Sequence, residues 1–234
     1  MGWFLAWLAV FLGALVQAIT GFGLAIVCVP FLLLIDSSLA PIPVLMAAWV
    51  HSILMLQRYR HDIHAQQLVP AILGRVPGVL LAVTALLYFD SNLLNLIIGL
   101  MILLAVWMSA RGWQMQQNHR NFFLISTVSG MMGTISGVGG PPMAMLVRQQ
   151  KPDQIRGFLA GYFFIGTLIS ILSLALAGLI TDDHLIAALA FSPAVLLGTF
   201  LGPILLKRYR LDNLEKPLLW LCAIGGVWVI VDNL

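Results

Sequence analysis

Residues 13–23 read GALVQAITGFG, and residues 130–142 read GMMGTISGVGGPP, so a glycine-rich stretch opens each half of the chain. An offset of about 116 residues, about half the chain, aligns Gly21 with Gly137. The same offset continues to align similar residues far downstream, where Pro77 falls on Pro193. The sequence therefore predicts an internal repeat of two halves.

Both stretches lie inside apolar segments, where glycines and prolines close together are expected to break a helix and leave backbone groups unpaired. At membrane depth, such a break is tolerated only where it is buried in protein or lines a cavity. We therefore expect the breaks at Gly21 and Gly137 to form the ligand site.

The composition is that of an integral membrane protein. Of the 234 residues, 61% are hydrophobic and 9% are charged, which excludes a soluble domain. The net charge of +3 does not indicate a nucleic-acid partner, because Lys and Arg stand in short connections between apolar segments. The sequence contains no recognisable nucleophile–base pair, paired intramembrane carboxylates or set of metal ligands, so we expect neither an enzyme nor a cofactor.

Eight apolar segments are suited to form helices, four in each half. They cover residues 3–34, 39–57, 68–89, 93–110, 122–147, 158–180, 185–206 and 217–231. No linker separates the halves. We therefore expect residues 1–234 to form a single transmembrane domain, with repeats at about 1–116 and 117–234.

The distribution of positive charge predicts the topology, because Lys and Arg collect on the cytoplasmic side. The connections after the second, fourth, fifth and seventh segments contain such residues and are predicted to be cytoplasmic. These residues are Arg58, Arg60, Arg111, Arg120, Arg148, Lys151, Arg156, Lys207, Arg208, Arg210 and Lys216. The other three connections and both termini contain none, so they are predicted to lie on the outer, periplasmic side.

This assignment places both flanks of segment 122–147 inside and both flanks of segment 3–34 outside. Each broken segment is therefore predicted to be a re-entrant helical hairpin, while the other six segments cross the membrane. Since each half then has an odd number of crossings, the second half runs opposite to the first. The predicted fold is an all-α integral membrane protein with an inverted-topology repeat, the common plan of secondary transporters.

Two hairpins entering from opposite faces would meet near the middle of the membrane. Their tips would present backbone amides and helix N-termini, which bind anions without a formal charge. Thr20 and Ser136 would add hydroxyls. The glycine pairs at 157 and 161 and at 198 and 202 are interpreted as helix packing sites. The predicted substrate-binding residues are Gln17, Thr20, Gly21, Phe22, Gly23, Arg75, Ser136, Gly137, Gly139, Gly140 and Pro141.

Two ionisable residues lie well inside predicted crossings at similar depth. Arg75 is about 10 Å from the cytoplasmic end of its helix and has no intramembrane carboxylate to neutralise it. A guanidinium in this setting suits an oxyanion, although snorkelling to the cytoplasmic end is an alternative. His51 could carry a coupling proton or be a hydrogen-bonded core histidine.

The two glycine motifs together resemble the TauE/SafE sulfite exporter family, and the similarity covers essentially the whole chain. The residues that carry the resemblance are Gly13, Gln17, Gly21, Phe22, Gly23, Pro30, Gly130 and the run from Ser136 to Pro142. The resemblance implies an inner-membrane permease that exports sulfite or a small organosulfonate such as sulfoacetate, driven by an ion gradient. Arg75 and His51 match no family motif and rest on the physical argument alone.

The sequence thus predicts a secondary transporter that moves a small sulfur-containing anion outward by alternating access. The glycine breaks would cradle the anion, Gln17 would orient it and Arg75 would attract it from the cytoplasm. A small-anion channel and an importer of the same anions remain alternatives, since the same half-helices would serve a channel. The expected partners are the anion, the lipid bilayer and a coupling ion, H⁺ or Na⁺. A homodimer is left open.

Overall fold

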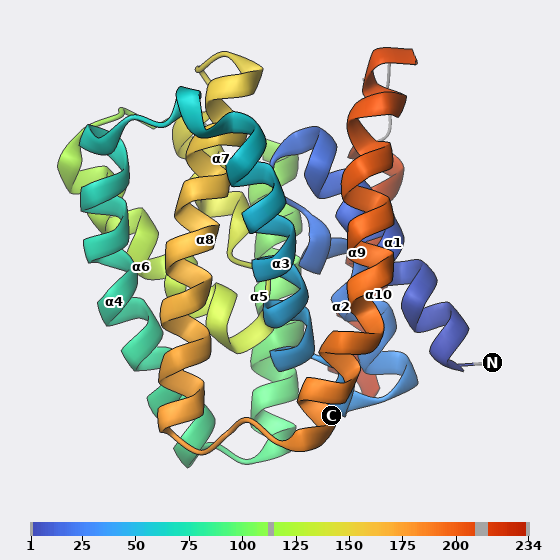
Figure 1. The fold of residues 1–234 in the computed structure, drawn as a ribbon. Helices are drawn as coiled ribbons and strands as arrows, with labels where there is room; N and C mark the ends of the chain where they lie inside the picture. Colours follow the sequence, from blue (N-terminus) through green and yellow to red (C-terminus); the bar gives the residue numbers. More distant parts are fainter. Residues whose placement is uncertain (1, 112–114, 209–214, 233–234) are drawn as a thin grey trace.

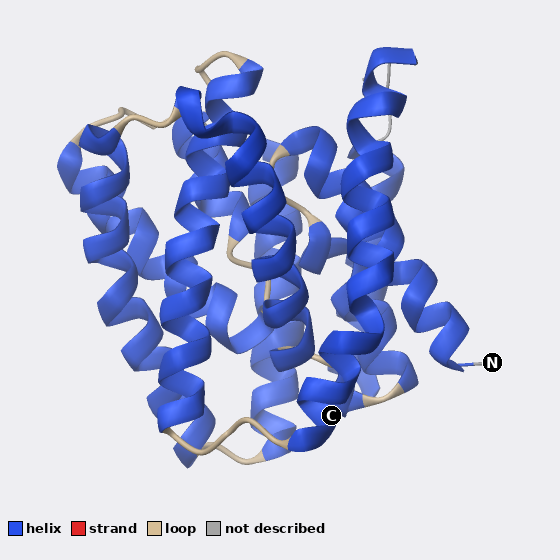
Figure 2. Ribbon diagram, viewed as in Figure 1, coloured by secondary structure: helices blue, strands red, loops and turns tan. Residues whose placement is uncertain are grey.

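The computed structural model describes residues 2–111, 115–208 and 215–232, which are helical apart from short connections (Figures 1 and 2). The helices of the first half are α1 (Gly2–Thr20), α2 (Leu24–Ile35), α3 (Ile42–Tyr59), α4 (Ala65–Tyr88) and α5 (Ser91–Arg111), with short 3-10 helices η1 (Ser37–Leu39) and η2 (Arg60–Asp62). Those of the second half are α6 (His119–Ser136), α7 (Gly140–Val147), α8 (Pro152–Leu176), α9 (Asp182–Arg208) and α10 (Glu215–Asp232). The described residues contain no strand, which confirms the all-α prediction.

Six described helices are long and apolar enough to cross a membrane, namely α1, α3 with its flanking 3-10 helices, α4, α5, α8 and α9. Five of them were also predicted from the sequence to cross. The helix α1 was assigned to a hairpin, yet its 19 residues are sufficient to span a bilayer core. Conversely, segment 217–231, in α10, was predicted to cross but is not among the six, and part of α10 lies outside the residues whose side chains the structure describes.

The connections gather at two opposite ends of the bundle (Figure 1). The turns before α4, α6 and α8 lie at the top of the view, and those before α3, α5 and α9 lie at the bottom. Gln150 links the connections at the top to one another, because its Nε2 lies 3.0 Å from Gln67 Oε1 and 2.9 Å from Gln117 Oε1. The basic connections therefore share one end, here called the basic end. Much of the connection from Lys207 to Lys216 lies outside the described residues.

Small residues allow the long helices to pack backbone against backbone. A Cβ added to Gly74 of α4 would collide with the carbonyl oxygen of Phe123 in α6, and one on Gly198 of α9 would lie 2.6 Å from the carbonyl oxygen of Phe11 in α1. A Cβ on Gly157 would lie 2.9 Å from the carbonyl oxygen of Tyr59. These contacts confirm close helix packing at Gly157 and Gly198, one member of each pair predicted to serve packing.

The two short helices lie in the interior of the bundle. Every residue of α7 is buried, and so is the first part of α2, from Leu24 to Pro30. The longer helices surround them and turn large apolar side chains outward, including Leu80 of α4 and Phe200 of α9. The glycine breaks that precede α2 and α7 are thereby held inside protein, where polar backbone groups need a partner or a ligand.

Candidate functional site

The first break follows Thr20 and is built by local hydrogen bonds. Thr20 Oγ1 lies 3.0 Å from the carbonyl oxygen of Val16 and accepts from the N–H of Phe22 at 3.3 Å. The N–H of Gly21 donates to the carbonyl oxygen of Gln17 at 2.8 Å. Gly21 has a φ of 91°, a conformation that favours glycine because a side chain is strained there. The residue types around the break thus enforce it.

The second break repeats this arrangement about 116 residues later. Ser136 Oγ donates to the carbonyl oxygen of Met132 at 2.7 Å and accepts from the N–H of Val138 at 3.2 Å. The N–H of Gly137 donates to the carbonyl oxygen of Gly133 at 2.9 Å, and Gly137 has a φ of 76°. The hydroxyls of Thr20 and Ser136 therefore hold the breaks in shape, a role that sequence analysis had not assigned to them.

The two breaks diverge after their first glycine. Gly23 has a φ of 119° and precedes α2, whereas Gly139 has a φ of −89° and precedes the Gly-Pro-Pro start of α7. They meet in space, because a Cβ added to Gly140 would lie 2.8 Å from the Cβ of Phe22. The two breaks are thus adjacent but not equivalent.

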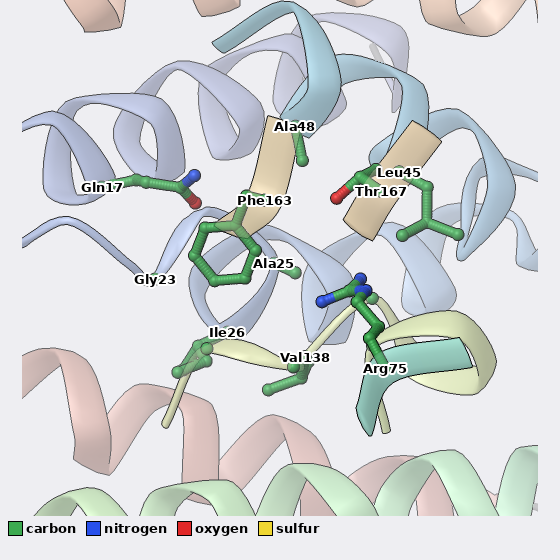
Figure 3. A pocket seen from close by; sticks show the side chains of 14 residues that line it. Gln17, Gly23, Ala25, Ile26, Leu45, Ala48, Arg75, Val138, Phe163 and Thr167 are labelled. Carbon is green, nitrogen blue, oxygen red and sulfur yellow. The ribbon is translucent and has the colours of Figure 1, made fainter. Parts of the chain in front are cut away.

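A cavity lies where the breaks meet (Figure 3). It offers about 30 Å³ to the centres of water molecules, which is room for roughly two waters. Seven helices and both breaks contribute to its lining, which consists of Gln17, Gly23, Ala25, Ile26, Leu45, Ala48, Arg75, Gly133, Gly137, Val138, Gly139, Gly140, Phe163 and Thr167.

Six of the predicted site residues line this cavity: Gln17, Gly23, Arg75, Gly137, Gly139 and Gly140. The other five do not. Phe22 packs against Gly140, Thr20 and Ser136 bond within their breaks, and Pro141 is buried in the first turn of α7. Gly21 lines a second, smaller space together with His51.

Arg75 supplies the positive charge of the cavity. Its side chain is 1% exposed, and its Nε and Nη1 atoms are buried without a hydrogen-bond partner in the described residues. The guanidinium lies 4.9 Å from the ring centroid of Tyr162 and points into the cavity (Figure 3). The one salt bridge among the described residues joins Arg156 to Asp153 instead. Arg75 therefore does not snorkel, and among the described residues its guanidinium has the Tyr162 ring but no carboxylate beside it.

Glycines on two neighbouring helices create the slot that holds Arg75. A Cβ on Gly166 of α8 would collide with Cδ and Nε of Arg75, and one on Gly130 of α6 would lie 3.0 Å from its Cγ. A Cβ on Gly133 would lie 3.4 Å from Nη2 of Arg75 and 3.3 Å from the Cα of Gly139. The guanidinium and the second break thus flank the same point.

Backbone donors complete the anion-binding character of the cavity. The N–H groups of Gly139 and Gly140 donate no hydrogen bond to any described residue. Gln17 behaves differently, because its Oε1 accepts from the N–H of Leu24 at 3.0 Å and so occupies one donor at the start of α2. This bond directs the amide nitrogen of Gln17 toward the cavity. The free donors and the unpaired guanidinium together favour a small oxyanion.

A buried hydroxyl network fixes the second break beside Arg75. Tyr162 OH lies 2.9 Å from both Ser126 Oγ and Ser129 Oγ, and Ser129 Oγ donates to the carbonyl oxygen of Gly139 at 2.5 Å. Sequence analysis missed Tyr162 and its α8 neighbours Phe163, Gly166 and Thr167. Their signal was a set of polar and small residues in the middle of an apolar segment.

Tyr162→Phe should test this network. The ring that contacts Arg75 is kept, while the hydroxyl between Ser126 and Ser129 is lost, so we expect destabilisation by about 1–2 kcal/mol. We also expect several-fold weaker anion binding, because Ser129, which donates to the carbonyl oxygen of Gly139, loses its hydrogen bond from Tyr162. Thermal unfolding and equilibrium binding of sulfite measure these effects. Phe158→Leu, a buried ring on the same helix without a hydroxyl, is the control for core packing. An unchanged affinity in Tyr162→Phe would contradict a positioning role for this network.

His51 lies outside the main cavity. Its Nδ1 is 2.7 Å from Thr199 Oγ1, and Thr199 Oγ1 donates to the carbonyl oxygen of Val195 at 2.6 Å. Thr199 therefore accepts from Nδ1–H of His51, which leaves a lone pair on Nε2. That Nε2 atom is buried without a hydrogen-bond partner in the described residues, beside the smaller space. His51 is thus oriented by one nitrogen, while the other has no described partner.

No group of three or more His, Cys, Asp or Glu side chains suited to a metal ion is found among the described residues.

Comparison with known proteins places this chain in a family. No curated protein and no solved structure matches it. The family model for the sulfite exporter TauE/SafE matches residues 6–229, nearly the whole chain, including both glycine breaks and Arg75. This match agrees with the membrane-type helical fold, and the chain therefore belongs to the sulfite exporter TauE/SafE family.

Proposed function

We propose that this protein exports sulfite or a small organosulfonate and binds it in the cavity at Arg75. The observation that carries the proposal is the unpaired, buried guanidinium. An isolated cation removed from water costs several kcal/mol, and an anion in the cavity would offset that cost. Membership of a sulfite exporter family points to the same class of ligand.

The cavity suits the smallest member of that class. Space for roughly two waters is comparable to the volume of a sulfite ion, whereas a substrate such as sulfoacetate would require the cavity to widen. Nε and Nη1 of Arg75 can donate to two sulfite oxygens, and the N–H groups of Gly139 and Gly140 can donate to the third. We therefore propose sulfite, in preference to an organosulfonate, as the substrate.

We further propose that the two halves form an inverted repeat with the breaks as re-entrant hairpins. Helix contacts support this, because they occur in matched pairs: α4 packs on α6 as α9 packs on α1, and α2 packs on α10 as α7 packs on α5. The matched hydrogen bonds at Thr20 and Ser136 support it as well. In this arrangement the basic end is cytoplasmic and both termini are periplasmic, in the bacterial inner membrane.

Sulfite flux into proteoliposomes tests the proposed function. The native protein should move labelled sulfite, respond to an imposed pH gradient, and be inhibited by other small sulfur oxyanions more strongly than by chloride. Movement of another small anion but not sulfite would overturn the substrate assignment. Flux that follows only the sulfite gradient, without response to H⁺ or Na⁺, would favour a channel over a carrier.

His51→Gln tests the proposed coupling residue. Glutamine keeps a hydrogen-bonding side chain near Thr199 but cannot bind and release a proton, so we expect sulfite exchange to continue while the response to a pH gradient is lost. His61→Gln is the matched control, because His61 lies exposed at the basic end. A normal pH response in His51→Gln would assign the proton to sulfite itself or to another group.

A further inference from the structure

A second, smaller space, too narrow in this conformation to admit a water molecule, lies beside the Arg75 cavity. It is lined by Gln17, Gly21, His51, Ser52, Met55, Arg156, Ala160 and Phe163. Gln17 and Phe163 are the two residues that also line the Arg75 cavity, so these side chains separate the two spaces. The proposed binding of an anion at Arg75 does not by itself explain this second space.

The order of residues along two helices shows where the smaller space leads. On α8, Arg156, Ala160 and Phe163 recur at helical spacing and continue to Thr167 in the Arg75 cavity, a rise of about 16 Å. On α3, Met55 and Ser52 of the smaller space are followed in depth by Ala48. Arg156 and Met55 are the members nearest the basic end, where these helices begin and end respectively.

The smaller space carries groups that suit an anion in transit. The Nη1 of Arg156 pairs with Asp153 at 2.8 Å and its Nε donates to the carbonyl oxygen of Ile19 at 2.8 Å, which holds a partly exposed guanidinium at the mouth. Deeper in, the His51 residue is only 1% exposed, and its Nε2 atom is buried without a described hydrogen-bond partner. An unpartnered buried nitrogen in a space bordered by an arginine indicates a polar ligand.

The opposite side of the Arg75 cavity is apolar. Leu45 lines that cavity and belongs to a cluster with Ile42 and Leu174, which Met46, Val83, Leu86, Ile171, Leu179 and Ile180 surround. Ile42 begins α3 and Leu174 stands near the end of α8, so this cluster lies toward the end opposite the basic one. In Figure 3, Leu45 lies near Thr167 while Phe163 lies near Gln17.

We propose that the space between Arg156 and His51 is the access passage through which a small oxyanion reaches Arg75 from the basic end, with Phe163 as its gate. The inference rests on the proposed function, since it supplies the route to that binding site. In the structure described here, the Phe163 ring separates passage from site, and the Leu45 cluster seals the other side. A rotation of Phe163, together with a widening of the now closed passage, would connect the passage to the site without opening a continuous pore.

Cysteine labelling tests the route without relying on transport. Ser52→Cys places a thiol in the passage, and Ala48→Cys places one in the Arg75 cavity, beyond Phe163. The probe is a membrane-impermeant thiosulfonate carrying a sulfonate group, applied to sealed vesicles of each orientation. Arg58→Cys and Ser38→Cys, both at exposed positions, identify the basic and the opposite end. The native chain, which keeps Cys28 and Cys222, gives the background.

We expect Ser52→Cys to react from the same side as Arg58→Cys, and Ala48→Cys to react from that side at least tenfold more slowly. Phe163→Ala should raise the rate at Ala48→Cys by about tenfold and leave that at Ser52→Cys within twofold, which also shows that the fold is intact. Phe163→Leu, a milder change, should give an intermediate rate. A cationic probe should be slower than the sulfonate at Ser52→Cys, after normalisation to Arg58→Cys.

Three outcomes would overturn the passage. Ala48→Cys could react from the side of Ser38→Cys, Phe163→Ala could leave its rate unchanged, or the cationic probe could be as fast as the sulfonate at Ser52→Cys. Labelling is carried out without sulfite, which would itself consume the probe. If the labelling pattern holds but sulfite flux is absent, the passage stands and the proposed substrate fails. If flux is present but the pattern fails, the substrate stands and the route is wrong.

Discussion

Arg75→Met is expected to abolish sulfite transport and at the same time to stabilise the empty protein. Two charge-assisted hydrogen bonds to the anion, each worth about 1.5 kcal/mol, correspond to a loss of about 100-fold in affinity. The empty protein gains because an unpaired buried cation is replaced by an apolar chain of similar length. We expect the free energy of unfolding to rise by about 1–3 kcal/mol. A structural arginine would give the opposite sign, because its loss would break native contacts.

Two measurements check this result. Flux in proteoliposomes gives transport, and the apparent melting temperature in detergent, with and without sulfite, gives stability and binding. In the native protein, sulfite at about 100 times its Kd should stabilise by about 2.7 kcal/mol, and this gain should vanish in Arg75→Met. Arg75→Lys should retain part of the affinity for sulfite but lose the bidentate hydrogen bonding that a guanidinium provides. Arg58→Met, at an exposed position of the basic end, should behave like the native protein. Normal transport by Arg75→Met would remove Arg75 from the site.

The breaks could be predicted from sequence because their chemistry is local. A glycine with positive φ after a residue that bonds back to the preceding turn is encoded within five positions, in each half of the chain. The unpaired state of Arg75 could be predicted for a similar reason, since the segments contain no carboxylate for it to pair with. Both inferences depend on which residues are present more than on how distant helices pack.

The direction of side chains could not be predicted in the same way. Thr20 and Ser136 were expected to face the ligand. A Ser or Thr hydroxyl in a helix can instead bond to the backbone carbonyl four residues earlier, and both of these hydroxyls do so. The α8 residues were missed because their importance arises only when α8 packs against α4 and α3. Gly166, for example, becomes part of the site by making room for Arg75, more than ninety positions earlier in the chain.

Gly139→Ala is expected to impair transport more than the backbone conformation of Gly139 suggests, because the structure leaves no space for a side chain at this position. Its φ of −89° is accessible to alanine, but a Cβ would lie 2.5 Å from the carbonyl oxygen of Ser129 and 2.9 Å from the Cα of Gly133. Both are backbone atoms, so relief requires α6 and the second break to separate. We expect transport to fall more than tenfold, since Gly139 and Gly140 would move away from Arg75.

Gly178→Ala is the matched control for this substitution. Gly178 has a φ of +71° with no atom within 4 Å of an added Cβ, so alanine there meets backbone strain of about 1–2 kcal/mol but no collision. It lies in the turn between α8 and α9, away from the cavity. We therefore expect Gly178→Ala to lower the melting temperature slightly and to transport sulfite at the native rate. Gly139→Ala should lose sulfite-dependent stabilisation even where it folds. If it binds and transports normally, the break can shift without loss of function, and the anion must be held by Arg75 without the amides of the second break.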